Sequence, residues 1–263
     1  MGSYFKKYIC LLLILVMLAS CSPKEGSNSN TTKTVELTIS AAASLKESLE
    51  IIQSKYELEH PNVKIRFNFG GSGSLKQQIV QGAPVDLFFS AAEDKFNELV
   101  EEGFIAKEDW DVLLMNELVI IVPSNNPMDV SSLEDLIHKN IDHISIGIPE
   151  TVPAGKYAKE SLRNQELWSD LESKMVLAKD VRQVLSYVET ASVAAGIVYK
   201  TDAMVSDKVD IISTIDSDTH TLIHYPVGIL NDSKNYEAAK DFYDFLTSDE
   251  SIEVFKDYGF HTY

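Results

Sequence analysis

The sequence predicts an α/β protein of two lobes, and two observations carry that prediction. From residue 35 onward, short β-rich runs alternate with amphipathic helical patterns, which is typical of βαβ units with largely parallel sheets. Two longer apolar runs, 117–123 and 221–230, stand far apart, and the chain between them has its own alternation of strands and helices. We interpret the two runs as strands that cross between lobes, with a cleft between the lobes.

The elements of each lobe follow from hydrophobic spacing. Helical spacing places the apolar residues of 45–56 and of 181–188 on single faces that can be buried. The C-terminal helical patterns have to return to the first lobe. We therefore expect a first lobe of residues 34–118 and 229–263 and a second lobe of residues 119–228. The expected strands are 35–40, 63–69, 86–90, 118–122, 144–148, 175–178 and 197–199.

The N-terminus is typical of an exported bacterial lipoprotein. Lys6 and Lys7 precede an apolar run, 9–18, that is shorter than the roughly twenty residues of a membrane-spanning helix. Residues 1–20 are therefore a predicted signal peptide. The sequence Leu18-Ala-Ser-Cys21 resembles the cleavage box of bacterial lipoproteins, which implies a lipid on Cys21. Residues 21–33 are small and polar, as in a flexible tether, so we expect an extracytoplasmic protein anchored to the cell membrane.

Composition and charge limit the kinds of partner. With 44% hydrophobic and 24% charged residues, the 263-residue chain can bury a sizeable core. The net charge of −17 becomes −19 without the signal peptide, because residues 1–20 contain Lys6 and Lys7 and no acidic residue. This charge argues against nucleic acid as a partner. Cys10 and Cys21 both precede the predicted fold, which excludes a disulfide or a cysteine metal site within it.

Several predicted helices begin in a way that suits an anion. The Gly/Ser-rich run 69–79 leads directly into a helix, whose first turn carries N–H groups without intrahelical partners. Similar helix starts follow expected strands at 43–47, 151–155 and 179–183. If these helix starts converge, they form one site for a small anion.

The same helix starts also carry ordinary capping signals. Pro153 occupies a first helical position, where its fixed φ and missing N–H are tolerated. Ser72 lies between two glycines and ahead of a better cap candidate, so its hydroxyl is left over, and the glycines let the backbone approach a ligand. The pairs with capping-box spacing are Ser44 with Glu47, Ser74 with Gln77 and Asp180 with Gln183.

Enzyme and metal motifs fit the sequence less well. The run 70–74 lacks the last glycine of a nucleophile elbow and the ending of a phosphate-binding P-loop. A serine hydrolase that uses Ser72 or Ser44 with a later histidine stays open as an alternative. His220 and His224 lie near two aspartates, but solvated polar residues explain that cluster better than a metal site.

Five short motifs match a known family in order. Together with Tyr258-Gly-Phe260, they resemble the molybdate-binding proteins of bacterial ABC importers, from about residue 35 to the end of the chain. The resemblance implies the type II periplasmic binding protein fold, in which two lobes close on the ligand. The five motifs are Ala41-Ala-Ala-Ser-Leu45, Gly82-Ala-Pro-Val-Asp-Leu-Phe88, Pro153-Ala-Gly155, Asp180-Val-Arg182 and Gly196-Ile-Val-Tyr199.

The resemblance also implies a binding site and a role. Ser44 and Ser72 would supply hydroxyl and backbone N–H donors from the first lobe, and Ala154 and Val181 would supply backbone N–H donors from the second. Tyr199 would add its phenolic hydroxyl. The implied protein is a monomer without catalysis or cofactor, which captures molybdate and delivers it to a membrane permease driven by a cytoplasmic ATPase.

The chemistry of molybdate suits a site made of donors. At neutral pH molybdate is a fully deprotonated dianion, which accepts hydrogen bonds and donates none. Phosphate keeps a proton that would face a donor in such a site, so it is rejected. Sulfate has to be excluded by its smaller size, whereas tungstate should bind like molybdate. A receptor for sulfate or another oxyanion stays open as an alternative.

Overall fold

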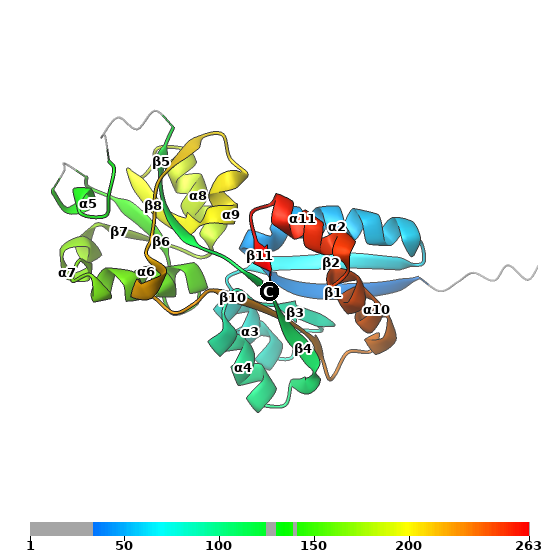
Figure 1. Cartoon of the computed structure of the whole chain (residues 1–263). Helices are drawn as coiled ribbons and strands as arrows, with labels where there is room; N and C mark the ends of the chain where they lie inside the picture. Colours follow the sequence, from blue (N-terminus) through cyan, green and yellow to red (C-terminus); the bar gives the residue numbers. More distant parts are fainter. Residues whose placement is uncertain (1–33, 125–129, 139–140, 263) are drawn as a thin grey trace, which may run out of the picture. The chain divides into compact units, whose positions relative to one another are not determined.

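Two sheets, each covered by helices, make up the part of the chain that the structure describes (Figure 1). The computed structural model describes residues 34–124, 130–138 and 141–262. The predicted signal peptide, the tether and Cys21 lie outside these ranges. Among the described residues, no helix is both long enough and apolar enough to span a bilayer.

The first sheet has the strand order β11-β4-β10-β3-β1-β2 among the described residues. Strands β1, β2 and β3 are parallel, whereas β10 runs antiparallel to both β3 and β4, and β11 pairs antiparallel with β4. The strands are β1 (Val35–Ala42), β2 (Val63–Gly70), β3 (Leu87–Phe89), β4 (Ile105–Met115), β10 (His224–Leu230) and β11 (His261–Thr262). The helices of this lobe are η1 (Ala43–Leu45), α2 (Lys46–Glu59), α3 (Ser72–Val80), α4 (Glu93–Glu101), α10 (Tyr236–Leu246) and α11 (Asp249–Asp257).

The second sheet repeats this plan with the order β7-β6-β8-β5-β9 in the described part of the chain. Strands β6, β7 and β8 are parallel, and β5 is antiparallel to β8 and to β9. The strands are β5 (Leu118–Pro123), β6 (Ile144–Gly147), β7 (Met175–Ala178), β8 (Ala195–Tyr199) and β9 (Val209–Thr214). The helices are α5 (Asp135–His138), α6 (Pro153–Asn164), α7 (Trp168–Leu171), η2 (Glu172–Lys174), α8 (Val181–Glu189), α9 (Lys200–Met204) and η3 (Ser217–Thr219).

The chain crosses between the lobes twice, but not along the strands that the sequence suggested. The apolar runs 117–123 and 221–230 contain β5 and β10, and each of these strands lies inside a sheet. The crossings are instead the short segment 116–117 and the segment 215–223. They touch each other, because Asn116 N–H donates to Ile223 O at 3.2 Å. An apolar run fits a sheet centre as well as a crossing, which is why the pattern did not separate the two.

The sheet pairing also sets where the second lobe ends. The sequence placed that end at residue 228, whereas β10 pairs with the first sheet from His224 onward. The return to the first lobe is therefore complete before His224. The first crossing agrees with the expected boundary to within two residues, since β4 ends at Met115 and β5 begins at Leu118.

Burial follows the predicted spacing. The apolar stripe of α2 is fully buried, and Tyr56 at its end packs edge-on against Phe242 and Phe245 of α10. This contact brings the C-terminal helices back onto the first lobe, as expected. On α8, Val181, Leu185 and Val188 are buried at helical spacing.

Helix α6 begins unusually close to the end of strand β6. A Cβ built on Gly155 would lie 1.9 Å from the carbonyl oxygen of Gly147, so only glycine fits at residue 155. Pro153 is the first residue of α6, as the sequence predicted, and its fixed φ suits that position. The close approach therefore fixes where the first turn of α6 lies.

We expect Gly155→Ala to lower the free energy of unfolding by about 3 kcal/mol, because its Cβ meets backbone that cannot rotate away. Gly70→Ala is the matched control, since its Cβ would meet only the Leu75 side chain, at 3.4 Å. The control should lose less than about 1 kcal/mol. Urea denaturation of both variants checks the prediction, and equal losses would contradict it.

Candidate functional site

A small cavity lies between the two lobes, and several helix starts surround it. The space between its walls is about 200 Å³ even with the part that is open to solvent, so only a small ligand fits. Its walls come from η1, α3, α6, α8 and the end of β8, together with the loops that precede these helices. All five sequence-predicted binding residues line it, namely Ser44, Ser72, Ala154, Val181 and Tyr199.

One capping prediction holds at this site. Asp180 caps α8, because its carboxylate accepts from the Gln183 N–H at 2.8 Å. The Gln183 side chain reaches back and accepts from the Lys179 N–H at 2.8 Å. This pair fixes the first turn of α8, so the N–H of Val181 lies at a helix start and has no intrahelical partner. Ala154, the second residue of α6, is in the same position.

The other two capping predictions are wrong. Ser44 lies inside the short helix η1, and no side chain caps η1 or α2. Helix α3 begins at Ser72 and follows Gly71, two residues before the expected cap Ser74, again without a side-chain cap. Tertiary packing rather than local capping therefore sets these two starts, and the hydroxyls of Ser44 and Ser72 are used elsewhere.

Both serines are buried and hydrogen-bonded to the protein. Ser72 Oγ accepts from the Ala91 N–H at 2.9 Å, which leaves its own hydrogen to donate. Ser44 Oγ lies 2.9 Å from Tyr225 Oη, where either hydroxyl can be the donor. Neither contact is the histidine contact that the hydrolase alternative requires.

Tyr199 is the third hydroxyl at the cavity. It is buried, and its Oη has no hydrogen-bond partner among the described residues. Burial raises the pKa of Tyr199 well above its ordinary value, so the hydroxyl keeps its proton at neutral pH. The ring packs edge-on against Tyr225, with the centroids 5.8 Å apart. A buried phenol without a partner is suited to donate to a ligand.

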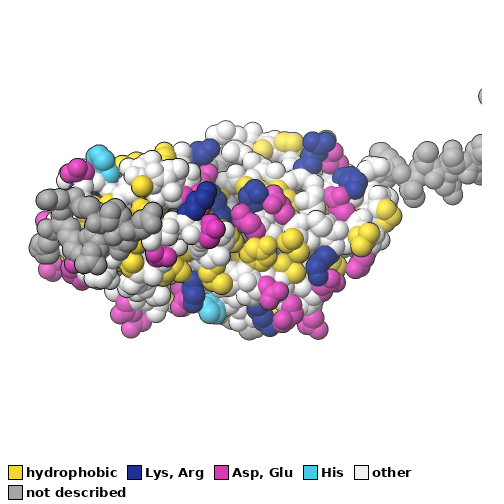
Figure 2. All heavy atoms as spheres, turned by 90° about the horizontal axis from the view of Figure 1, so that it is seen from above, with side chains coloured by type: hydrophobic (Ala, Val, Ile, Leu, Met, Phe, Trp, Pro, Cys, Tyr) yellow, Lys and Arg dark blue, Asp and Glu magenta, His cyan; other side chains and the backbone are white. Residues whose placement is uncertain are grey.

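Charged side chains are kept away from the cavity. None of the described residues that line it is charged. Two cations in the helices around the cavity are paired with carboxylates, Lys156 with Asp94 at 2.9 Å and Lys76 with Glu98 at 2.6 Å. Figure 2 shows a similar mixing on one face of the molecule, where Lys and Arg lie among Asp and Glu. An anion in this cavity would therefore be held by helix starts and hydroxyl donors.

The glycines of the Gly/Ser loop allow the lobes to touch. Gly73 N–H donates to Thr151 O of the other lobe at 3.0 Å. A Cβ on Gly73 would lie 2.8 Å from Thr151 Cα, and one on Gly71 would lie 2.7 Å from Thr151 O. The sequence suggested that these glycines admit a ligand, whereas in this arrangement they admit the backbone of the opposite lobe.

An ion-pair cluster beside the cavity was not foreseen from the sequence. Arg182 of α8 pairs with Glu47 of α2 across the two lobes, and its Nε lies 2.9 Å from Oδ1 of Asp202. The same Nε donates to Ala43 O at 3.3 Å. Burial raises the pKa of Asp202 to about 6, although Arg182 opposes the shift. The three charged residues lie far apart in sequence, so no local pattern signals the cluster.

The metal alternative finds no support. Among the described residues, no group of three His, Cys, Asp or Glu side chains is placed to hold a metal ion. His220 instead contacts the Thr221 carbonyl, and His224 pairs with Glu93 at 2.7 Å.

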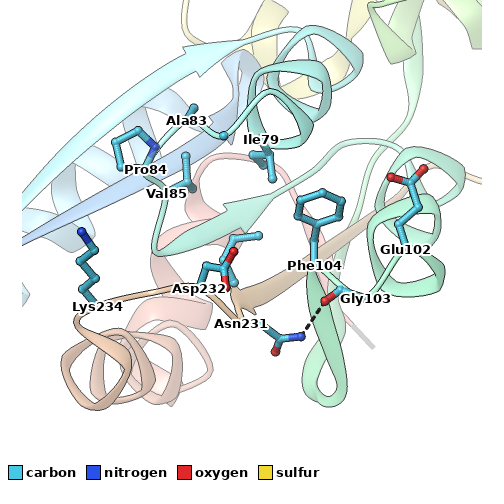
Figure 3. Close-up of a pocket in the computed structure, with 12 residues that line it drawn as sticks. Ile79, Ala83, Pro84, Val85, Glu102, Gly103, Phe104, Asn231, Asp232 and Lys234 are labelled. Atoms are coloured by element: carbon cyan, nitrogen blue, oxygen red, sulfur yellow. Dashed lines mark hydrogen bonds between the residues drawn. The ribbon is translucent and has the colours of Figure 1, made fainter.

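A larger pocket lies in the first lobe, away from the helix starts (Figure 3). Its volume is about 900 Å³ with the part that is open to solvent, and its floor is apolar, with Ile79, Val85 and Phe104. Across its rim, the Asn231 amide donates to the Gly103 carbonyl at 2.8 Å, as the dashed line in Figure 3 marks. None of the five predicted binding residues lines it. Size alone therefore does not identify the binding site here.

Comparison with known proteins places this fold in a family. Residues 37–261 match the family described as bacterial extracellular solute-binding proteins. The chain belongs to this family. Its members bind solutes and are not enzymes, which confirms the expected absence of catalysis and removes the hydrolase alternative.

Relatives of this solute-binding protein cover nearly all of it. "Putative ABC transporter substrate-binding lipoprotein YvgL" of Bacillus subtilis (strain 168) is 51% identical, over 97% of this chain and 98% of the relative. "Molybdate-binding protein ModA" of Haemophilus influenzae is 36% identical, over 86% and 89%. The solved periplasmic molybdate-binding protein of Azotobacter vinelandii superposes with a TM-score of 0.77 at 20% identity, over 86% of this chain and 99% of that chain. The last comparison confirms the predicted two-lobed type II fold.

We expect the buried Asp202 to make this solute-binding protein less stable as the pH rises. Its folded-state pKa of about 6 lies above its ordinary 3.8, so the folded state holds the proton more tightly over that range. The free energy of unfolding of the wild type, relative to Asp202→Asn, should therefore fall by about 1–3 kcal/mol between these two values. Denaturant unfolding of both proteins across this range measures it, and a constant difference would contradict the raised pKa.

Proposed function

We propose that this protein binds molybdate, and tungstate alike, in the cavity between its lobes. The observation that carries the proposal is the donor set of the cavity. Among the described residues, the hydroxyl hydrogens of Ser72 and Tyr199 have no acceptor, and the N–H groups of Ala154 and Val181 lie at helix starts. Similarity to the molybdate-binding protein of Haemophilus influenzae supports this ligand.

The energetics favour a fully deprotonated dianion. Burying an isolated charge in an apolar medium costs tens of kcal/mol, so several strong hydrogen bonds have to offset that cost. Hydrogen bonds to a charged group contribute about 1.5–3 kcal/mol each, and the positive ends of the helix dipoles add to them. Converging donors on several helix starts meet this need without a cation at the site.

The same donor set gives selectivity. Hydrogen phosphate has to place its proton against an acceptor, and none of the described side chains that line the cavity is a carboxylate. Sulfate carries the same charge as molybdate but is smaller, so donors held apart by two closed lobes contact it less well. Tungstate is nearly the size of molybdate and should therefore bind in the same way.

Capture is followed by delivery to an ABC transporter permease and its ATPase. Membership in the solute-binding family supports this role, and the Bacillus subtilis relative carries the words ABC transporter and lipoprotein in its name. We propose that Cys21 carries the lipid, so that a monomer works outside the cytoplasm on a tether of residues 21–33.

Calorimetry with the full-length protein, freed of bound anion, tests the ligand. We expect tight binding of molybdate and tungstate and no measurable heat from sulfate or phosphate at the same salt concentration. Sulfate binding as tightly as molybdate would replace the proposal with a sulfate receptor. No anion binding at all would leave only the fold and the family.

We expect Gly73→Ala to weaken molybdate binding by roughly 30-fold, because its Cβ would meet the Thr151 backbone and disfavour closure. Stability without ligand should stay unchanged or rise slightly, since separation of the lobes relieves the contact with Thr151 and alanine suits a helix better than glycine. Gly70→Ala, at the end of β2, serves as the control, because Gly70 also lines the cavity but its Cβ would meet only the Leu75 side chain and not the opposite lobe. Equal affinities of the two variants would mean that this lobe contact is not part of binding.

A further inference from the structure

A chain of buried side-chain hydrogen bonds runs from the first crossing segment to the cavity. It begins at Asn116, whose Nδ2 lies 3.2 Å from Tyr225 Oη, and it continues from Tyr225 Oη to Ser44 Oγ at 2.9 Å. All three residues are less than a tenth exposed. Ser44 is the end of the chain, and it lines the cavity.

The direction of this chain is set at Asn116. The Asn116 side-chain oxygen accepts from the Glu117 N–H at 2.9 Å, so the amide nitrogen has to face Tyr225. That nitrogen can only donate, and it also donates to Thr201 Oγ1 at 2.9 Å. Tyr225 Oη is therefore an acceptor for Asn116.

The direction then passes along the chain to the cavity. Tyr225 has one hydrogen, and among the described residues Ser44 Oγ is the acceptor within hydrogen-bond distance, since the neighbouring Tyr199 Oη forms no hydrogen bond. Burial raises the pKa of Tyr225 well above its ordinary value, so the phenol keeps this hydrogen. Ser44 Oγ thus accepts from Tyr225, and the Ser44 hydrogen is left for whatever occupies the cavity.

We propose that Asn116, which does not line the cavity, is a positioning residue that makes Ser44 a donor and so helps select a fully deprotonated oxyanion. The inference rests on the proposed function of the same cavity. Ser72 offers an internal comparison, because the Ala91 backbone N–H fixes it as a donor independently of Asn116. Asn116 therefore matters for the direction of the Ser44 hydroxyl and not for that of Ser72.

Asn116→Asp reverses the direction of these hydrogen bonds with almost no change in the shape of the side chain. A carboxylate accepts and does not donate, so the Tyr225 hydroxyl turns toward it and Ser44 donates to Tyr225. Ser44 then presents lone pairs to the cavity. We expect molybdate affinity to fall roughly 10- to 100-fold, the effect of losing a hydrogen bond to a charged group. Hydrogen phosphate can donate its proton to Ser44, so the preference for molybdate over phosphate should fall as well.

Double-mutant cycles separate this role from a general effect of the new charge. In a Ser44→Ala background, the hydrogen-bond chain no longer reaches the cavity, and Asn116→Asp should lower molybdate affinity at most a few-fold. In a Ser72→Ala background, Asn116→Asp should lower molybdate affinity by the same factor as in the wild type. Calorimetric titration of the full-length variants with molybdate, alone and in competition with a high concentration of phosphate, measures the affinity for molybdate and the preference over phosphate. Equal losses in all three backgrounds would overturn the proposal.

Tyr225→Phe tests the same chain without an added charge. The ring keeps its edge-on packing against Tyr199 and Phe260, so folding is protected. With the donor to Ser44 gone, the preference for molybdate over phosphate should fall about 10-fold. An unchanged preference would overturn the proposal. A wild type that does not bind molybdate would instead overturn the proposed function, so the two failures are distinguishable.

Discussion

The N–H groups in the first turn of a helix have no acceptor within that helix, and several such turns face one cavity here. They lie together because each helix follows a parallel strand of a sheet. Helices η1 and α3 follow the neighbouring strands β1 and β2, and α6 and α8 follow the neighbouring strands β6 and β7. Each lobe therefore contributes a pair of helix starts to the same point. An anion with several acceptor oxygens satisfies both pairs at once.

The cavity handles charge differently from the surface. The chain carries a net charge of −17, and Lys76 and Lys156 near the cavity are already paired with carboxylates. Donor hydrogens on fixed backbone and buried hydroxyls keep their direction, so they need no reorganisation when a ligand arrives. A mobile lysine at the same place would bind phosphate and molybdate with less distinction. Under the proposed function, recognition therefore depends on the direction of the donor hydrogens more than on the number of charges.

Local patterns in the sequence predicted the features that local chemistry controls. Pro153 and Asp180 start their helices as expected, because a fixed φ and a cap act within one turn. Ser74 was misread as a cap, since the packing of the Gly/Ser loop against Thr151 starts α3 two residues earlier. The five binding residues came from a family resemblance, and the structure brings them to one cavity. Their role as ligand contacts stays a prediction.

Features that join distant parts of the chain were beyond the sequence. The contact of Ser44 with Tyr225 spans 181 positions, and that of Arg182 with Glu47 spans 135. The residues next to each member of such a pair in sequence do not indicate its distant partner. The apolar runs of β5 and β10 were found, but their partners were not, because hydrophobicity does not say which strand lies alongside. The strand pairing in the structure identifies these neighbours.

The strands of the second sheet occur in sequence between the early and late strands of the first sheet, and this order has a consequence for how the fold is assembled. All strands of the second sheet lie between residues 118 and 214, so that sheet is complete as soon as this stretch is available. The first sheet waits for β10 and β11, which come from the end of the chain. In a chain that emerges from its N-terminus, the lobe that starts first is thus the lobe that finishes last. Until β10 has formed, strand β3 of the first lobe has an unpaired edge. The first lobe is therefore more exposed to incorrect strand pairing than the second.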